Sequence, residues 1–538
     1  LTGSMASSPA NAAAVTFAST TNNYLTLGVG VFIDRVIVAK NSDIFTTAGS
    51  GYTKINKPTY GTVLVNGGSQ SGGTLAVDGL TSAPQAGDVF TVAGIDKVYT
   101  ITTDASVSSG GSTIAISPNL ASSPADNAAV TFISVARESA TKTRFCRYKY
   151  ATDEMIAIVD GTNAPALWNN VTFTVLDNAP SEVVGATFVT DFKKHLFFAK
   201  ADKLTFTAPY TDNDFTAAGG AGSITVGGSV TGLMVFREQL IIFTETAIYQ
   251  LSGNTIADFQ LKPVTTDVGC VDTDTIQEVG GDVMFLGPEG LRLLSGTDRI
   301  GDFGLAVVSK KIQNQMTELI TNNQSFASIV IRGKSQYRIF GYSTNITREN
   351  SQGILGTQFS SQGGDNMAWA ETKGIRAYVA DSRFYSNVET IVFSNNDGYL
   401  YQLENSNSFD GANIATTFAT PFVPINDPRT RKTFYKAFLY TDPQGSVSFE
   451  MSLKLDFDEK NTIQPTQIDF NNATGTVAFF GSASYGSTAV YSGKLLKLFE
   501  TQLIGSGFTG SFQFQTDSTD PPFSLDAITI EYGTNTRR

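Results

Sequence analysis

Pairs of short apolar strands recur through the middle of the chain, each pair joined by a polar or glycine-containing turn. Clear pairs lie at 240–251, 283–294 and 391–403, and the earlier run 31–46 has the same form. Repeats of roughly forty to fifty residues that each supply a few antiparallel strands are typical of propeller blades, and the pattern predicts about five to seven of them. A plain β-sandwich assembled from hairpins is the alternative, because degenerate repeats are easily over-counted.

A different pattern occupies residues 61–137. Short alternating or apolar runs follow one another between 73 and 135, separated by turns that contain glycine. Strands this short bury a common core most simply by curling into a small closed barrel. We therefore predict a barrel over 61–137, inserted between the first propeller-type strands at 21–60 and the propeller proper at 138–415. Loop tips tolerate the insertion of whole domains.

One helix and a C-terminal sheet layer complete the expected fold, which is all-β in class. Alternating strands predict a separate β-sheet domain over 416–538. A helix is expected over 307–320, where four apolar residues follow the 3.6-residue period: Val308, Ile312, Met316 and Leu319.

The sequence also contains an internal repeat. ASSPANAAAVTF at 6–17 and ASSPADNAAVTF at 121–132 agree at ten of twelve positions. The second copy is the expected closing strand of the barrel, so residues 1–20 are predicted to be the end of a similar, truncated barrel. An expression scar before Met5 is the alternative origin of the first residues. An unpaired strand leaves backbone groups unsatisfied, so this segment is expected to pair with the intact barrel, a propeller edge or a neighbouring subunit.

Composition and charge exclude several function classes. The 538 residues include 50 Gly, 38 Phe and 19 Tyr but 2 Cys, 1 His and 7 Met, which argues against disulfide frameworks and zinc clusters. Lys and Arg number 37 against 49 Asp and Glu, and the net charge of -12 makes stable electrostatic binding to DNA unexpected. No stretch reaches the ~18 apolar residues of a membrane span, and the first residues do not resemble a signal peptide.

The usual catalytic constellations are incomplete. Nucleophilic catalysis by Ser or Cys usually needs a His, and His195 lies in a predicted strand, where a structural role is expected. Cys146 and Cys270 are expected to be buried free thiols, with one disulfide as the alternative. We predict no catalytic, cofactor-binding or metal-binding residues and no enzymatic activity. Glycan cleavage is harder to exclude, because it needs only two carboxylates ~5 to 9 Å apart.

Short acidic and glycine-rich motifs are expected to be turns. The glycine-rich run 219–223 has no helix after it and therefore no helix N-terminus to hold a phosphate. Three acidic pairs have the spacing of two EF-hand ligands but lack the Gly and the distal Glu that such a loop requires: Asp212/Asp214, Asp272/Asp274 and Asp456/Asp458.

Several segments share a succession of turns and aromatic residues. They are FVTDFKKHLFFAKADKLTFTAP, GAGSITVGGSVTGLMVFREQLIIFTETAIYQLSG, GDVMFLGPEGLRLLSG, QYRIFGY, DGYLYQLENSNSFDG and DPRTRKTFYKAFLY. Over roughly residues 140–538 this succession resembles the β-propeller tail proteins of tailed bacteriophages, of the nozzle or tail tubular protein B type. The barrel segment AGDVFTVAGIDKVYTIT resembles the small modules that decorate phage capsid and tail proteins. An inserted barrel near the N-terminus departs from the nozzle pattern.

The resemblance implies a structural virion protein that is made in the host cytoplasm and uses no cofactor. Six copies would form a ring below the portal and adaptor, in contact with tail fibre proteins, and DNA would leave the capsid through its channel without specific binding. A charge of -12 agrees with this expectation, because attraction to phosphate would hold the DNA back. The alternative is a receptor-binding or glycan-binding tail or baseplate protein, possibly glycan-cleaving, whose aromatic residues would stack on sugars.

Overall fold

The chain folds predominantly into β-structure and divides into two compact units, Phe17–Gln402 and a C-terminal unit that begins at Leu403. No helix in the described part of the chain is long and apolar enough to cross a bilayer. The computed structural model describes residues 17–18, 25–40, 43–47, 51–55, 60–81, 83–84, 88–132, 137, 140–171, 173–176, 178–295, 307–361, 364–385, 387–405, 407–459, 462–471, 477–478, 490–491 and 498–535.

Within Phe17–Gln402, the described residues form a closed barrel and seven antiparallel sheets that follow one another in chain order. The strands of these sheets are β2 (Thr26–Phe32), β3 (Arg35–Lys40), β4 (Asp43–Thr47) and β5 (Thr53–Lys54); β12 (Arg144–Tyr148), β13 (Met155–Val159), β14 (Ala166–Trp168) and β15 (Phe173–Val175); β16 (Phe188–Phe192), β17 (His195–Lys200), β18 (Lys203–Phe206) and β19 (Gly222–Thr225); β20 (Val230–Phe236), β21 (Gln239–Thr244), β22 (Ile248–Ser252) and β23 (Gln260–Thr265); β24 (Gln277–Val279), β25 (Asp282–Gly287) and β26 (Gly290–Leu293); β27 (Ser325–Ile331), β28 (Gln336–Tyr342), β29 (Gly353–Ser361) and β30 (Gly364–Thr372); and β31 (Val379–Tyr385), β32 (Val388–Ser394) and β33 (Tyr399–Gln402) with β1 (Phe17–Ala18).

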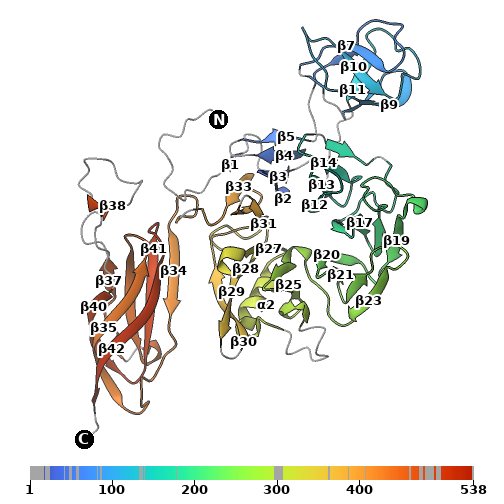
Figure 1. The fold of residues 1–538 in the computed structure, drawn as a ribbon. Coiled ribbons are helices and arrows are strands. Elements are labelled where there is room, and N and C mark those ends of the chain that lie inside the picture. Colours follow the sequence, from blue (N-terminus) through green and yellow to red (C-terminus); the bar gives the residue numbers. More distant parts are fainter. Residues whose placement is uncertain are drawn as a thin grey trace. The chain divides into compact units, whose positions relative to one another are not determined.

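The seven sheets are arranged in a closed cycle (Figure 1). The first strand of each sheet contacts the first strand of the next, and β31 of the last sheet contacts β2 of the first. Between the fourth and fifth sheets the contact runs through the short 3-10 turn η2 (Thr273–Thr275), which precedes β24. We call this arrangement the sheet ring.

Apolar faces of adjacent sheets pack on each other around the sheet ring. Phe32 and Ile37 of the first sheet, for example, form one buried cluster with Ile156 and Trp168 of the second. Alternating residues of each strand face these clusters, so the hairpin pattern in the sequence becomes a row of inter-sheet cores.

Glycines allow the first two sheets to approach closely at the centre. A Cβ at Gly28 would lie 2.4 Å from the carbonyl oxygen of Thr143, and one at Gly30 would lie 3.0 Å from the ring of Phe145. Both glycines lie on β2, and Thr143 and Phe145 lie on or just before β12. A larger residue at either position would push these two strands apart.

The last sheet takes its fourth strand from the start of the chain. Phe17 pairs with Leu400 and Ala18 with Tyr399, so β1 lies antiparallel to β33. Of the three partners expected for the N-terminal segment, the structure shows a sheet edge. The rest of the segment predicted as a truncated barrel, 1–16 and 19–20, lies outside the described residues.

The inserted barrel is closed, with strand order β10-β7-β6-β11-β8-β9. Its core, which includes Leu75, Phe90, Tyr99 and Ile114, consists of barrel residues. Its strands lie within the expected range 61–137 and are β6 (Val63–Val65), β7 (Thr74–Asp78), β8 (Val89–Val92), β9 (Ile95–Ile101), β10 (Ser112–Ser117) and β11 (Ala129–Phe132).

The helix expected over 307–320 begins later than predicted. A 3-10 turn, η3 (Lys310–Ile312), leads into α2 (Gln313–Asn322), in which Met316 and Leu319 are buried. Val307 forms a β-bridge with Arg292, and the Ser309 hydroxyl accepts a hydrogen bond from the Leu291 amide at 3.1 Å. These tertiary contacts with β26 hold residues 307–309 outside any helix, and residues 310–312 form the 3-10 turn, so the first six predicted residues lie outside α2.

The C-terminal unit is built mainly from two antiparallel sheets with a shared core. Phe434 and Leu439 of one sheet pack with Met451, Leu453 and Phe512 of the other. The unit begins before the expected residue 416, because β34 pairs with β41. The sheets are β34 (Ile414–Ala419), β41 (Gly510–Ser518), β36 (Ser448–Leu455) and β37 (Ile468–Asn471); and β40 (Leu498–Gly507), β35 (Arg431–Pro443) and β42 (Phe523–Asn535), while β38 (Val477–Ala478) pairs with β39 (Val490–Tyr491).

Candidate functional site

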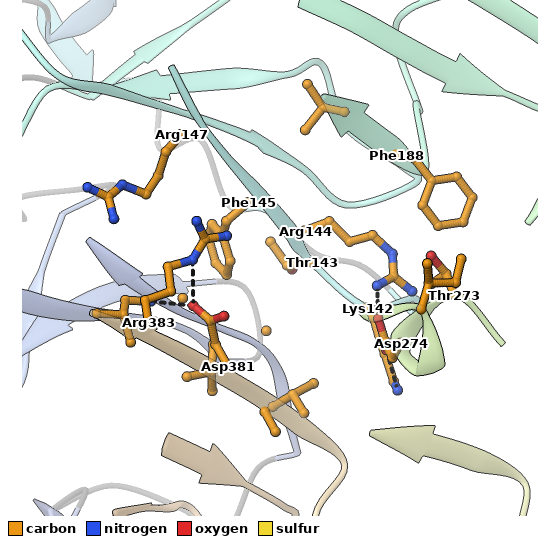
Figure 2. Close-up of a pocket in the computed structure, with 18 of the residues that line it drawn as sticks. Lys142, Thr143, Arg144, Phe145, Arg147, Phe188, Thr273, Asp274, Asp381 and Arg383 are labelled. Atoms are coloured by element: carbon orange, nitrogen blue, oxygen red, sulfur yellow. Dashed lines mark hydrogen bonds and ion pairs between the residues drawn. The ribbon is translucent and has the colours of Figure 1, made fainter. Parts of the chain in front are cut away.

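A cavity of about 290 Å³ lies at the centre of the sheet ring (Figure 2). All seven sheets contribute to its wall, mainly through their first strands. Strand alternation aims every second residue of these strands inward, which explains why distant parts of the sequence meet here. The charged residues of the wall are Lys142, Arg144, Arg147, Asp274, Asp381 and Arg383.

Asp274 links non-adjacent sheets across this centre. Its carboxylate lies 2.7 Å from Lys142 Nζ and accepts a further hydrogen bond from Arg144. Lys142 and Arg144 lie at the start of the second sheet, whereas Asp274 precedes the fifth. Lys142 Nζ also donates to the carbonyl oxygen of Phe326 at 2.8 Å, which adds the sixth sheet to the network. The ion pairs therefore cross the middle of the sheet ring.

The two neighbouring aspartates of this network have opposite pKa shifts. Burial opposes ionisation of Asp274, but Arg144 and Lys142 outweigh it and hold the pKa of that carboxyl at about 2. Burial, with the Asp274 charge beside it, raises the pKa of Asp272. Asp272 accepts hydrogen bonds from the amides of Phe326 at 3.0 Å and Asp274 at 2.9 Å. Asp274 is thus the charged partner of Lys142 and Arg144. Asp272 holds the backbone around Asp274 through its hydrogen bonds to the two amides.

The remaining charges of the wall are paired as well. Asp381 accepts a hydrogen bond from the Val31 amide at 2.8 Å and lies 3.3 Å from Arg383 Nε, which joins the last sheet to the first. Arg147 pairs with Glu154 at 3.1 Å. Each of the six charged side chains described in the wall therefore has a partner of opposite sign, and the chemistry of the cavity is that of a structural hub.

The sole histidine is part of an aromatic core. His195 is 1% exposed, and its Nδ1 donates to the Thr207 carbonyl oxygen at 2.6 Å. Phe206 and Phe259 contact the ring edge-on at centroid distances of 5.5 and 5.7 Å. This position agrees with the structural role expected from the sequence.

The two cysteines are free, and Cys270 is buried as expected, whereas Cys146 is half-buried. Burial raises the pKa of both Cys146 and Cys270 to about 12. A thiol with such a pKa carries almost no thiolate at neutral pH and is a poor nucleophile.

The acidic pairs lie apart and perform separate structural roles. Asp212 accepts a hydrogen bond from the Tyr148 hydroxyl, and Asp214 accepts one from the Thr216 amide in a turn. In the described residues no group of three or more His, Cys, Asp or Glu side chains could hold a metal ion. The run 219–223 begins at the end of a 3-10 turn and enters strand β19 at Gly222, so no helix follows it, as the sequence indicated.

Sequence reasoning singled out Asp272 and Asp274 for a different chemistry and missed the basic residues of the hub. Lys142 and Arg144 alternate with Thr143 at the start of a strand, an arrangement that is common on exposed edges. Their separation from Asp274 by about 130 residues leaves no local signal. Only the strand order around the sheet ring would have predicted that Lys142 and Arg144 contact Asp274.

Comparisons with known proteins bear on the barrel. Residues 58–135 match the family model of the B domain of distal tail protein pb9. The matched range contains all six barrel strands. Among curated proteins, none matches the sequence.

Solved structures give weak likenesses. The computationally designed Ika8 protein has a TM-score of 0.34 at 8% identity, over 73% of this chain and 99% of its own. AztD from Citrobacter koseri has a TM-score of 0.26 at 11% identity, over 71% and 89%. An ancestral GH74 enzyme has a TM-score of 0.29 at 9% identity, over 70% and 48%. Likenesses at these scores carry no argument about function. The barrel match supports a structural role for this chain in the tail of a tailed bacteriophage.

Proposed function

We propose that this chain is a nozzle-type structural protein of a phage tail. Six copies would form a ring below the portal and adaptor, next to tail fibre proteins, and genomic DNA would pass through the ring without specific binding. The observation that carries the proposal is the barrel at 58–135, which matches a phage distal tail domain and lies in a chain of all-β architecture. The net charge of -12 favours passage over retention of DNA.

The sheet ring is, in this proposal, a seven-bladed β-propeller. Three observations on the described residues support it: the sheets follow chain order, their first strands contact one another in a closed cycle, and β1 adds the fourth strand to the last sheet. Radial repetition of this kind protects sheet edges, which suits a rigid building block.

The DNA channel of such an assembly would lie between copies. The centre of the sheet ring is a cavity of about 290 Å³ crossed by the ion pairs of Asp274 with Lys142 and Arg144. A duplex has grooves that alone measure ~6 to 12 Å across. The lumen would therefore be formed by the surfaces that six copies turn toward a common axis.

We also propose that the chain is not an enzyme. The burial of His195 in an aromatic core and the raised pKa of the two thiols support this, because the imidazole is closed off from solvent and the thiols carry almost no thiolate at neutral pH. The competing function is glycan binding or cleavage.

Electron microscopy of intact virions tests the proposal. An antibody against the barrel should label the tail, and the purified chain should form closed rings with a lumen wide enough for a duplex. Labelling of another part of the particle would contradict it. Release of reducing ends from host-surface polysaccharide by the purified chain, abolished by a single carboxylate substitution, would favour the glycan function instead.

A further inference from the structure

The central cavity of the sheet ring has one end at which basic side chains stay accessible. The side chain of Lys142, beside Asp274, is 9% exposed, whereas those of Arg147 and Arg383 are 29% and 43% exposed. Figure 2 shows Arg147 and Arg383 on one side of the cavity and Lys142 with Asp274 on the other. The end that carries the two arginines is therefore the one that a ligand from solvent meets first.

The two arginines reach this end from different sheets. Arg147 lies on β12 of the second sheet, and Arg383 lies on β31 of the last sheet. Both come to the end of β2 in the first sheet. The guanidinium of Arg147 lies over the ring of Phe32 at 5.7 Å, and Asp381, the partner of Arg383, accepts a hydrogen bond from the Val31 amide at 2.8 Å. We call Arg147 and Arg383 the arginine pair.

Each member of the arginine pair is held by one carboxylate and keeps further donors. Arg383 contacts Asp381 through Nε at 3.3 Å, and Arg147 contacts Glu154 through one terminal nitrogen at 3.1 Å. Neither guanidinium makes a further hydrogen bond to another residue in the described part of the chain. A guanidinium carries several N–H groups, so most donors of the arginine pair are not used by these two contacts. The carboxylates thus orient the guanidinium groups without occupying them fully.

The charges around the cavity favour an anion. Its wall contains four basic and two acidic side chains, and Glu154 outside the wall leaves an excess of one positive charge. Asp272 is not part of the wall, and its carboxylate accepts hydrogen bonds from the amides of Phe326 and Asp274. The whole chain has a net charge of -12, so the cavity differs in sign from the molecule. A concave site lined by one excess charge attracts small ions of the opposite sign.

We propose that the arginine pair binds one small oxyanion per chain, either a phosphate or a carboxylate. The planar fork of arginine matches the oxygens of both groups. Cavities of about 150 Å³ hold benzene, so one of about 290 Å³ has room for phosphate or for a carboxylate on a single sugar ring. The bound anion would join the second sheet to the last across β2. This inference goes beyond the proposed tail function and concerns the single chain.

Isothermal titration calorimetry of the full-length chain tests the site with sodium phosphate and with sodium glucuronate, at an ionic strength held constant by sodium chloride. At least one of the two anions should bind saturably, with one site per chain. Arg147→Gln and Arg383→Gln should each weaken binding about 10-fold or more, the usual effect of losing a hydrogen bond to a charged group. Arg35→Gln is the matched control, because Arg35 Nε lies 3.3 Å from Asp34 but Arg35 is not in the wall. It should bind like the wild type.

Asp381→Asn tests the sign of the effect. This change removes a negative charge beside Arg383, and the amide oxygen of the replacement can still accept the hydrogen bond from Val31. Binding of the anion should become about 3-fold tighter or more, because one repulsive charge is lost. If the arginine pair only holds sheets together, Asp381→Asn brings no gain in affinity.

Three results would overturn the inference. The first is a wild-type chain that binds neither anion saturably, and the second is a folded Arg147→Gln/Arg383→Gln variant that binds as well as the wild type. Far-ultraviolet circular dichroism establishes that the variant is folded, and the wild-type and Asp381→Asn titrations decide the matter if it is not. The third is displacement of the anion by a short DNA duplex, which would make the arginines a surface contact for polymer phosphates. If virions lack the chain, the proposed function fails while this binding stands.

Discussion

Asp274 is the carboxylate that pairs with two basic residues at the centre of the sheet ring, Lys142 and Arg144. Replacing it by Asn would leave Lys142, whose side chain is 9% exposed, and Arg144 without their carboxylate. Removal of one partner from a largely buried ion pair usually costs several kcal/mol. We expect Asp274→Asn to lower the free energy of unfolding at pH 7 by about 2 to 4 kcal/mol. Urea unfolding followed by tryptophan fluorescence measures this, since both tryptophans, Trp168 and Trp369, lie in the sheet ring.

Acidification should remove the difference between Asp274→Asn and the wild type. The pKa of Asp274 is about 2 in the folded chain, below its ordinary value near ~3.9. A depressed pKa stabilises the fold above the unfolded-state value and loses that effect as pH falls toward the folded-state value. Asp272→Asn is the matched control. Burial raises the pKa of Asp272, so the charged form of this carboxyl is unfavourable in the folded chain. Asp272→Asn should therefore lower the free energy of unfolding at pH 7 less than Asp274→Asn does. Equal losses of unfolding free energy for Asp274→Asn and Asp272→Asn would contradict the role of Asp274 as the charged partner.

Individual strand residues were easier to predict than the contacts they make. The apolar runs of the hairpins predicted at 240–251 and 283–294 contain buried core residues such as Leu251 and Phe285. The left-handed turn at Asp456–Asp458 and the charged hub were not predictable, because both depend on contacts between segments far apart in sequence. In particular, the turn contains no glycine, the residue that normally signals a positive φ.

Strand β2 fits against β12 only because it carries glycine at the contact. Alanine at Gly28 would place its Cβ 2.4 Å from the Thr143 carbonyl oxygen, a backbone atom that cannot turn aside. We expect Gly28→Ala to lower the free energy of unfolding by about 2 kcal/mol or more. A Cβ at Gly68 in the barrel meets no atom within 4 Å, so Gly68→Ala should change stability by less than ~0.5 kcal/mol. If Gly28→Ala leaves the free energy of unfolding unchanged, β2 and β12 can move apart without loss of stability.

The pairing of β1 with β33 predicts the effect of removing residues 1–20. The outer edge of β33 would lose its partner, and the amides at 399–400 should exchange faster in hydrogen–deuterium exchange. Peptides from β4 and β5, the outer strands of the first sheet, serve as the control and should keep their protection. Unchanged exchange at 399–400 would mean that β1 does not stabilise the last sheet.

Elements were predictable where one local pattern decided them. Hairpins followed from short apolar runs around turn residues, and the closed barrel followed from strands too short to bury a core in any other way. The helix start was wrong because tertiary contacts of Val307 and Ser309 with β26 outweighed the local period. The start of the C-terminal unit was placed too late because β34 pairs with β41, about 100 residues further on, which no local pattern reveals.

At the scale of the whole molecule, the barrel should be separable. Its buried core consists of barrel residues, and both ends of the insertion lie between the first two sheets. We expect residues 58–135 alone to fold, with cooperative loss of near-ultraviolet dichroism from Tyr60 and Tyr99 on heating. The chain with this segment replaced by a short glycine–serine linker should retain the tryptophan unfolding midpoint of the wild type. A drop in that midpoint would show that the barrel supports the sheet ring.

Closure of the last sheet by β1 also sets an order of events during translation. Residues 17–18 are made about 380 residues before their partners, Tyr399 and Leu400. At ~5 to 20 residues per second this leaves β1 without its partner for roughly 20 to 80 s. The barrel and the first sheets can form in that interval, because their own strands are already complete. Strand β1 is therefore among the last strands of the sheet ring to be paired, and a ribosome that stalls before residue 399 holds a last sheet without its fourth strand.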